Sequence, residues 1–197
     1  MTIIIPLTRG QVTLVSDEDA DVADLKWYAC FSPGYANSGK FIARRGAGKG
    51  SVVLLHRIIL SRILERPLLR SEMVDHIHGN TLDNRRSELR LSTNAQNQAN
   101  VGRRSDNTSG FKGVYWNKRD RRWRALIRIN GKQILVGSYP TPEEAHAAYF
   151  RVAQAHYGEF ANPGVVITPA FDYQSLFAAA LTRAAHTPSA TPFEEAA

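Results

Sequence analysis

One segment restricts the fold of this chain more than any other, because two alternating strands, a tight turn and a capped helix follow one another there. In the run RRWRALIRI, apolar and basic side chains alternate, and a strand sends alternate side chains to opposite faces. One face can therefore pack on a helix while the other presents a row of guanidinium groups. The first face holds Trp123, Ala125, Ile127 and Ile129, and the second holds Arg122, Arg124, Leu126 and Arg128.

Turn and cap signals set the limits of this segment. The NG of RINGKQ is typical of a two-residue hairpin turn, and FKGVYW precedes it as a third strand-like run. The run TPEE begins with Thr141 as a helix cap, and Gly158 follows as a stop. We therefore expect a three-stranded antiparallel sheet packed on one helix over residues 110–163.

Positive charge is concentrated in the same region. Residues 101–132 hold ten Lys and Arg against two Asp, a net charge of +8, whereas residues 1–100 hold thirteen against ten acidic residues, a net charge of +3. Charge gathered in one segment suggests a polyanionic partner. A small sheet fits the DNA major groove, where arginine can pair with guanine, so we expect double-stranded DNA as the partner. An ordinary solvated strand face is the weaker alternative.

Composition excludes several classes of protein. A single cysteine rules out an internal disulfide and a four-cysteine zinc site, so no structural zinc is expected. No apolar stretch approaches the ~20 residues of a membrane helix. The opening MTIIIPLTRG is too short to be a signal peptide. We expect a cytoplasmic protein that associates with DNA and not with a membrane.

The first half of the chain is organised differently from the second. Residues 1–50 are expected to form short strands with turns, and residues 52–65 a strand that passes into an amphipathic helix. Residues 73–100 follow the order strand, polar loop, strand, helix. Residues 101–109 are a basic linker, and residues 164–197 are an Ala-rich, partly disordered tail. The whole chain is therefore expected to be an α+β protein.

Three polar residues in the first half are candidates for an active site. Asp75 and His76 are adjacent at the end of a predicted strand, and Asn97 lies on the helix that follows. A carboxylate suits Mg²⁺, which prefers oxygen ligands. A neighbouring imidazole can take a proton from water near neutral pH. On spacing alone, the alternative is that Asp75 and His76 are an ordinary surface pair whose hydrogen bonds are satisfied.

The run LLHRIIL…VDHIHGNTLDNRRSELRLSTNAQNQAN, at about residues 52–100, closely resembles the HNH homing endonucleases of phages and mobile introns. The resemblance implies an HNH nuclease domain over residues 1–100, with a core folded as a β-β-α-metal finger. It also implies that Asp75 and Asn97 hold a divalent metal, Mg²⁺ or Mn²⁺. By the same resemblance, His76 is the general base.

Other positions in this run match the family or depart from it. His56 and Arg57 match the family's HR pair, which the resemblance places near or at the DNA. Glu88 stands where the family has an Asn that fixes the loop and the catalytic His76. Glutamate accepts hydrogen bonds but does not donate as an amide does, so Glu88 joins His76 as a candidate catalytic residue that affects activity. His78 replaces a residue that is more often Asn or Asp.

Residues 108–162 resemble the plant ethylene-response-factor type of DNA-binding domain, through the KGV opening, the GSY strand end and the EEAHAAY helix. That family lays its three-stranded sheet into the major groove. Arg is usual where Tyr115, Asn117 and Gln133 stand, and Trp is usual at Leu135, so the plant family's preferred sequence is not carried over. The positions expected to contact DNA are Tyr115, Asn117, Arg124, Arg128 and Leu135, with Arg122 supporting them.

Together these patterns predict a metal-dependent, homing-type DNA nickase of phage or mobile-element origin, whose C-terminal sheet supplies target affinity. One active site per chain favours nicking over double-strand cleavage unless the protein dimerises. The alternative, favoured by Glu88, is a non-catalytic DNA-binding regulator that retains a degenerate nuclease core. An RNA-binding protein is a weaker reading, because the chain lacks the aromatic stacking array of single-strand readers.

Overall fold

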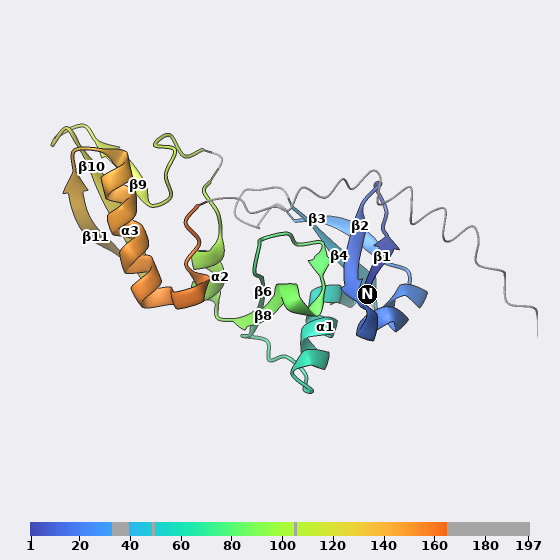
Figure 1. Ribbon diagram of the computed structural model, residues 1–197. Helices are drawn as coiled ribbons and strands as arrows, with labels where there is room; N and C mark the ends of the chain where they lie inside the picture. The colour runs from blue at the N-terminus through green and yellow to red at the C-terminus, as the bar shows by residue number, and fades with distance from the viewer. Residues whose placement is uncertain (33–39, 49, 105, 165–197) are drawn as a thin grey trace, which may run out of the picture.

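The described part of the computed structural model covers residues 1–32, 40–48, 50–104 and 106–164. These residues form two units, each around its own hydrophobic cluster (Figure 1). Helices accompany four small sheets, which confirms the α+β class. None of the described helices is long and apolar enough to cross a membrane. The Ala-rich tail expected after Gly164 lies outside the described residues.

The first unit begins with a sheet that joins distant parts of the chain. Strand β1 (Thr2–Pro6) is antiparallel to β2 (Val12–Ser16), and β2 is parallel to the two-residue β7 (Asp83–Asn84). The turn η1 (Asp17–Asp24) follows β2 directly. Both residues of β7 are buried, as are the first four residues of β2. This pairing anchors the polar loop of the HNH-like motif against the core.

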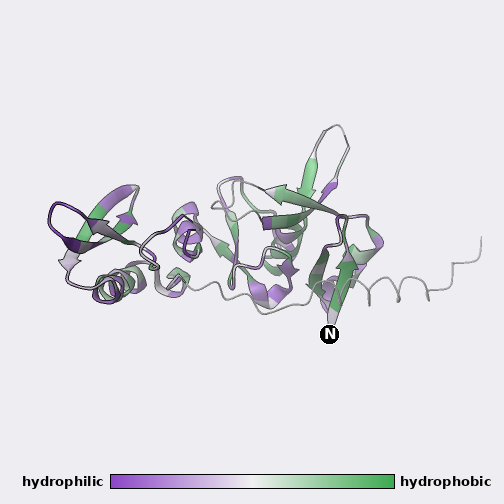
Figure 2. Ribbon diagram, turned by 90° about the horizontal axis from the view of Figure 1, so that it is seen from above, coloured by the Kyte–Doolittle hydropathy of each residue, from purple (hydrophilic) through white to green (hydrophobic). Residues whose placement is uncertain are grey.

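A second sheet leads into the main helix of this unit. Strands β3 (Tyr28–Ser32), β4 (Lys40–Gly46) and β5 (Val52–Leu54) are antiparallel neighbours, and β5 continues directly into α1 (Leu55–Ile63). Leu55, Ile59 and Leu60 are fully buried and share one helix face. Figure 2 shows apolar residues concentrated on the strands of this unit. The core of the first unit therefore lies between α1 and these strands.

The motif itself folds as two strands and a helix. Strand β6 (Met73–His76) pairs antiparallel with β8 (Leu89–Ser92), and α2 (Asn94–Asn100) follows. A complete capping box between Thr93 and Gln96 begins α2. Strand β7 and the turn η2 (Arg86–Glu88) lie in the intervening loop. The expected order of strand, loop, strand and helix is confirmed, with β7 as an addition.

The second unit is a three-stranded sheet covered by one helix (Figure 1). Strands β9 (Val114–Asn117), β10 (Arg122–Ile129) and β11 (Lys132–Tyr139) are antiparallel, and α3 (Pro142–Tyr157) packs on them. Ala125 and Ile127 are buried while Arg122 and Arg128 are exposed, which confirms the alternation in β10. The NG turn has φ angles of 50° and 76°, the positive values that a type I′ turn requires.

The end of the second unit returns to the helix of the first. After α3 and the turn η3 (Gly158–Phe160), the Asn162 side chain donates to the Asn100 carbonyl at 2.9 Å. The ammonium of Lys112 donates to the carbonyls of Ala99 and Asn162, at 2.5 and 3.2 Å. Figure 1 shows α2 standing between the two units, where these bonds form. The units are therefore joined by tertiary contacts as well as by the linker.

Candidate active site and DNA-binding surface

The imidazole of His76 lies at the end of a directed chain of hydrogen bonds. Its Nε2 is 3.2 Å from Asn84 Oδ1, and Asn84 Nδ2 donates to Thr13 Oγ1 at 2.7 Å. The Thr13 hydroxyl donates in turn to the Leu82 carbonyl at 2.8 Å. Because the amide oxygen of Asn84 faces the ring, Nε2 carries the proton and Nδ1 carries the lone pair.

The second ring nitrogen of His76 is left available. Nδ1 is a buried atom with no hydrogen-bond partner among the described residues. Burial lowers the pKa of His76 to about 4, against the hydrogen bond to Asn84 and the charge of Asp83, which raise it. The ring is therefore neutral at pH 7 and can accept a proton at Nδ1. An unpartnered buried acceptor in a folded protein calls for an explanation, such as an ordered water or a chemical role.

His56, the first residue of the HR pair in α1, lies against this site from inside the protein. His56 is 6 % exposed and meets the His76 ring edge to face, with centroids 5.5 Å apart. Burial, and then the charges of His76 and Arg57, lowers the pKa of His56 to about 3. Arg57 donates to the carbonyls of Glu72 and Leu69, at 2.9 and 3.0 Å. In this arrangement both residues brace α1, and their contact with DNA stays a prediction.

Asp75 is enclosed by polar partners. Its Oδ2 accepts a hydrogen bond from Arg90 Nε at 2.8 Å, and Asn100 Nδ2 lies 3.0 Å from both carboxylate oxygens. Burial raises the pKa of Asp75, while Asn100 and Arg90 lower it. Asn100 also donates to the His76 carbonyl at 2.9 Å, so the last residue of α2 holds the end of β6 in place.

Asn97, the second expected metal ligand, lies one turn before Asn100 on α2 and is 7 % exposed. No group of three His, Cys, Asp or Glu side chains that could hold a metal occurs in the described part of the chain. Asp75 and Asn97 offer oxygen donors only. Mg²⁺ binds through one or two carboxylates and keeps several waters, so this small oxygen set fits Mg²⁺ better than zinc.

Arg90 joins Asp75 to the second unit, and it was not among the residues predicted from the sequence. Its Nη1 donates to the carboxylate and to the carbonyl of Glu159, at 3.1 and 3.2 Å. The guanidinium lies 3.9 Å from the ring centroid of Phe160. The same side chain therefore contacts the expected metal ligand and the turn η3. The only local sequence signal for this role of Arg90 is the alternation in LRLS, which directs its side chain to one face of β8.

Glu88 is paired with His78, the other unusual residue of the motif. Glu88 Oε2 is 2.7 Å from His78 Nδ1, and Glu88 Oε1 is 4.0 Å from Arg85 Nη2. The acidic residue whose charge raises the pKa of His76 is Asp83. The two departures from the motif therefore contact each other, and the position that supports the His76 ring is Asn84.

The register of the second sheet brings the predicted DNA-contacting residues to one face. Cross-strand partners lie on the same face of a sheet. Leu135 is 49 % exposed and Tyr115 is 36 % exposed, so this outer face is open to solvent. The partner pairs are Arg122 with Asn117, Arg124 with Tyr115, Leu126 with Leu135, and Arg128 with Gln133.

The arginines of this face differ in their partners. Arg124 forms an ion pair with Asp120, and Asp120 also accepts a hydrogen bond from the Asn117 amide at 3.1 Å. Arg122 and Arg128 have no acidic partner within the described residues. Arg124 is therefore oriented by its neighbours, while the other two guanidinium groups are available to an incoming anion.

Comparisons with known proteins give one family model and two relatives. A family model described as the AP2 domain matches residues 109–159. The "Uncharacterized HNH endonuclease L560" of Acanthamoeba polyphaga mimivirus is 35 % identical over 159 residues, which cover 80 % of this chain and 77 % of that protein. "Protein 3.8" of Escherichia phage T7 is 32 % identical over 95 residues, which cover 43 % of this chain and 78 % of the phage protein. No solved structure gives a significant match.

Proposed function

The chain belongs to the HNH endonuclease family and carries an AP2 domain in its second half, and from this premise we propose that it hydrolyses phosphodiester bonds of double-stranded DNA with Mg²⁺ or Mn²⁺. The AP2 unit selects the site, and the motif over β6, β7, β8 and α2 serves as the β-β-α-metal finger. One such motif per chain favours a nick in one strand. The match to a phage protein supports a phage or mobile-element origin and a homing-type enzyme.

The observation that carries this proposal is the state of His76. Its Nε2 proton is committed to Asn84, its Nδ1 lone pair is free within the described residues, and Asp75 is its neighbour in β6. A general base must be neutral at the working pH and must present a lone pair to the proton it takes. Burial, which lowers the pKa of His76 to about 4, keeps the ring in that form at pH 7.

In the proposed mechanism, His76 Nδ1 takes a proton from water as the water oxygen attacks the phosphorus. The bond from phosphorus to one deoxyribose oxygen breaks, and that oxygen leaves and takes a proton from solvent. Thr13 and Asn84 hold the ring so that the proton stays on Nε2 and the lone pair on Nδ1. Asp75 and Asn97 would hold the divalent ion, which supplies stabilisation of the charge that develops on the phosphodiester. The contact between Arg90 and Asp75 has a part in orienting the carboxylate before DNA arrives.

The test is the conversion of supercoiled plasmid to open circles by the full chain at pH 7, with Mg²⁺ and with a chelator. Open circles that form only with the metal support a nicking enzyme. Linear plasmid as the first product supports double-strand cleavage and thus a dimer. An active enzyme in the presence of the chelator contradicts metal dependence.

A second candidate is a non-catalytic regulator that binds DNA through the AP2 unit. The pairing of Glu88 with His78 favours it, because both positions depart from the nuclease motif. The same plasmid assay separates the two candidates. A chain that shifts the plasmid on a gel but leaves it supercoiled with Mg²⁺ and with Mn²⁺ is a binder.

A further inference from the structure

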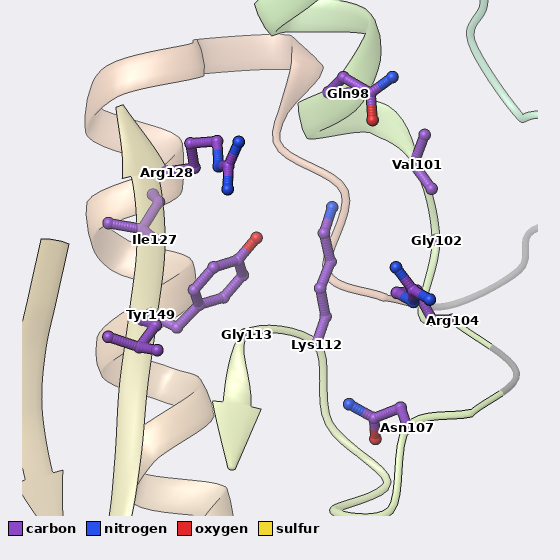
Figure 3. Close-up of a pocket in the computed structure, with 11 residues that line it drawn as sticks. Gln98, Val101, Gly102, Arg104, Asn107, Lys112, Gly113, Ile127, Arg128 and Tyr149 are labelled. Carbon is purple, nitrogen blue, oxygen red and sulfur yellow. The ribbon is translucent and has the colours of Figure 1, made fainter. Parts of the chain in front are cut away.

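A cavity of about 330 Å³ lies where the linker, α2 and the AP2 unit meet (Figure 3). Figure 3 shows Arg128 and Tyr149 on one side of it, and Gln98 and Arg104 on the other. Lys112 rises between the two sides. The lining holds three cationic side chains, of which Arg104 is ion-paired with Asp106 at 2.9 Å, and none of the described lining residues is acidic. A cavity of this charge suits an anion.

Two of its polar groups are unused by the protein. The Tyr149 hydroxyl and the Arg128 guanidinium have no hydrogen-bond or ion-pair partner in the described part of the chain, and both point away from the sheet in Figure 3. Burial raises the pKa of Tyr149 to about 12, so at pH 7 its hydroxyl is a neutral donor. A donor beside a guanidinium can contact two oxygens of one anionic group.

The side of the cavity next to Tyr149 and Lys112 is preorganised by contacts within the protein. Gly113 has a φ of 74°, and a Cβ at that position would overlap the ring of Tyr149. The Lys112 ammonium is held by the carbonyls of Ala99 and Asn162. Burial lowers the pKa of Lys112 to about 8, so most of its charge remains at pH 7. These groups do not need to move before an anion enters.

The cavity is continuous with the surface expected to meet DNA. Strand β9 pairs with β10 as far as Ala125, and the Leu126 amide then donates to the Gly113 carbonyl at 2.8 Å. Beyond this bond β9 no longer pairs with β10, and the Arg128 carbonyl accepts a hydrogen bond from the Tyr157 hydroxyl. Arg128 belongs both to the outer face of the sheet and to the cavity.

We propose that the cavity binds one phosphate of the DNA backbone, between the base pairs that meet the sheet and the phosphodiester that meets His76. This inference rests on the proposed function and names a contact that the outer face of the sheet does not supply. Arg128 and the Tyr149 hydroxyl contact the two free phosphate oxygens, while Lys112 adds positive charge. The site fixes the spacing between recognition and cleavage.

The test measures binding of the full chain to a duplex of random sequence, about 30 base pairs long, as salt is raised. Arg128→Gln removes one phosphate contact, so the slope of log affinity against log salt falls in magnitude by about 0.9. The matched control is Arg151→Gln, which makes the same charge change at an exposed position on α3 and leaves the slope unchanged. Tyr149→Phe keeps the charge and weakens binding several-fold, and it has no further effect when combined with Arg128→Gln.

Three outcomes overturn the proposal, and they are distinguishable. Equal slopes for Arg128→Gln and Arg151→Gln show that Arg128 acts only through net charge. Wild-type affinity in Tyr149→Phe shows that no phosphate of the DNA backbone enters the cavity. Inorganic phosphate that raises the melting temperature of the wild type but not of Tyr149→Phe, with duplex affinity equal in both, assigns the cavity to a free anion. A wild-type chain that fails to bind any duplex instead refutes the proposed function itself.

Discussion

The two units of this chain treat polar side chains in opposite ways. All eleven buried polar or charged residues of the described chain lie in the first unit, between Thr13 and Asn100. The core of the second unit is apolar and aromatic, and its arginines lie outside. Burying a polar group is unfavourable unless it is hydrogen-bonded, so the first unit depends on buried hydrogen-bond networks and the second on apolar packing.

This difference in the placement of polar groups matches the different requirements of catalysis and of DNA recognition. The proposed general base, His76, has to be held with one tautomer and one orientation, which the buried bonds of Thr13, Asn84 and Asn100 provide. The fully buried Asp19 is held in the same way by Arg62 and Arg86, at 3.0 and 2.7 Å. A recognition face needs its cations in solvent, where a phosphate can reach them. The four predictions that follow test this contrast, beginning with the largest effect.

The first prediction is that mild acid unfolds the first unit and spares the second. His56 and His76 have folded-state pKa values of about 3 and about 4, below the ordinary 6.5. As pH falls below 6.5 the unfolded state therefore takes up protons first, and stability present above pH 6.5 is lost down to pH 4. The loss at pH 4 is about 3 kcal/mol for each ring.

Hydrogen exchange resolved by segment, at pH 7 and pH 4.5 and corrected for intrinsic rates, measures this loss. Amides of α1 and β6 should lose protection at the lower pH, while amides of β10 keep it. Equal loss in the two units would remove the contrast between them.

The second prediction concerns the packed core of the AP2 unit. Gly113→Ala should destabilise that unit by about 3 kcal/mol, because it adds left-handed backbone strain and overlaps the Tyr149 ring. The matched control is Gly110→Ala, which has a similar φ of 80° and open space around its Cβ. That control should cost only about 1 kcal/mol. Denaturant unfolding of the two variants checks the difference, and equal costs would mean that packing against Tyr149 contributes little.

The third prediction separates cleavage from binding. His76→Ala should slow plasmid nicking by ~10²-fold or more, the range for loss of a general base. DNA affinity should stay within a few-fold, because the basic surface lies in the other unit. Nicking rates and duplex affinity are measured on the same preparations, with Cys30→Ala as a control substitution outside the motif. A variant that nicks at the wild-type rate would remove His76 from the mechanism.

The fourth and smallest effect concerns the pair of Glu88 and His78. Glu88→Asn leaves His78 without its carboxylate partner, which is 2.7 Å away in the wild type. We expect this variant to nick only several-fold more slowly than the wild type at pH 7. The double variant with His78→Asn, which restores the residues more usual in the family, should recover the rate. A pH profile of nicking for the three proteins measures this. A loss of all activity in Glu88→Asn alone would give Glu88 a direct catalytic role.

Local patterns were sufficient to predict the second unit. The alternation in β10, the NG turn and the cap at Thr141 all depend on neighbouring residues, and the structure contains each of them. The site of the first unit depends on contacts between distant residues. Asn84 supports His76 because β7 pairs with β2, nearly seventy positions earlier, and a two-residue strand leaves no periodic signal.

The partners of Asp75 show the same limit. Side-chain chemistry and the resemblance to the HNH family together gave Asp75, His76 and Asn97 as candidates. Arg90 meets Asp75 through strand register, and Asn100 meets it through the packing of α2, so neither contact is encoded in local spacing. Glu159 and Phe160 approach from the other unit altogether. Sequence patterns and the resemblance therefore gave Asp75 as a candidate and missed Arg90 and Asn100, which hold its carboxylate.

The guanidinium of Arg90 makes the two units less interchangeable than their separate cores suggest. A chimera that replaces the AP2 unit with another DNA reader would remove Glu159 and Phe160 and leave Arg90 with Asp75 alone. Such a graft would alter the nuclease centre even if the new reader bound its own target well. A chimera with a new target sequence therefore has to retain the η3 segment of this chain when the DNA-binding unit is replaced.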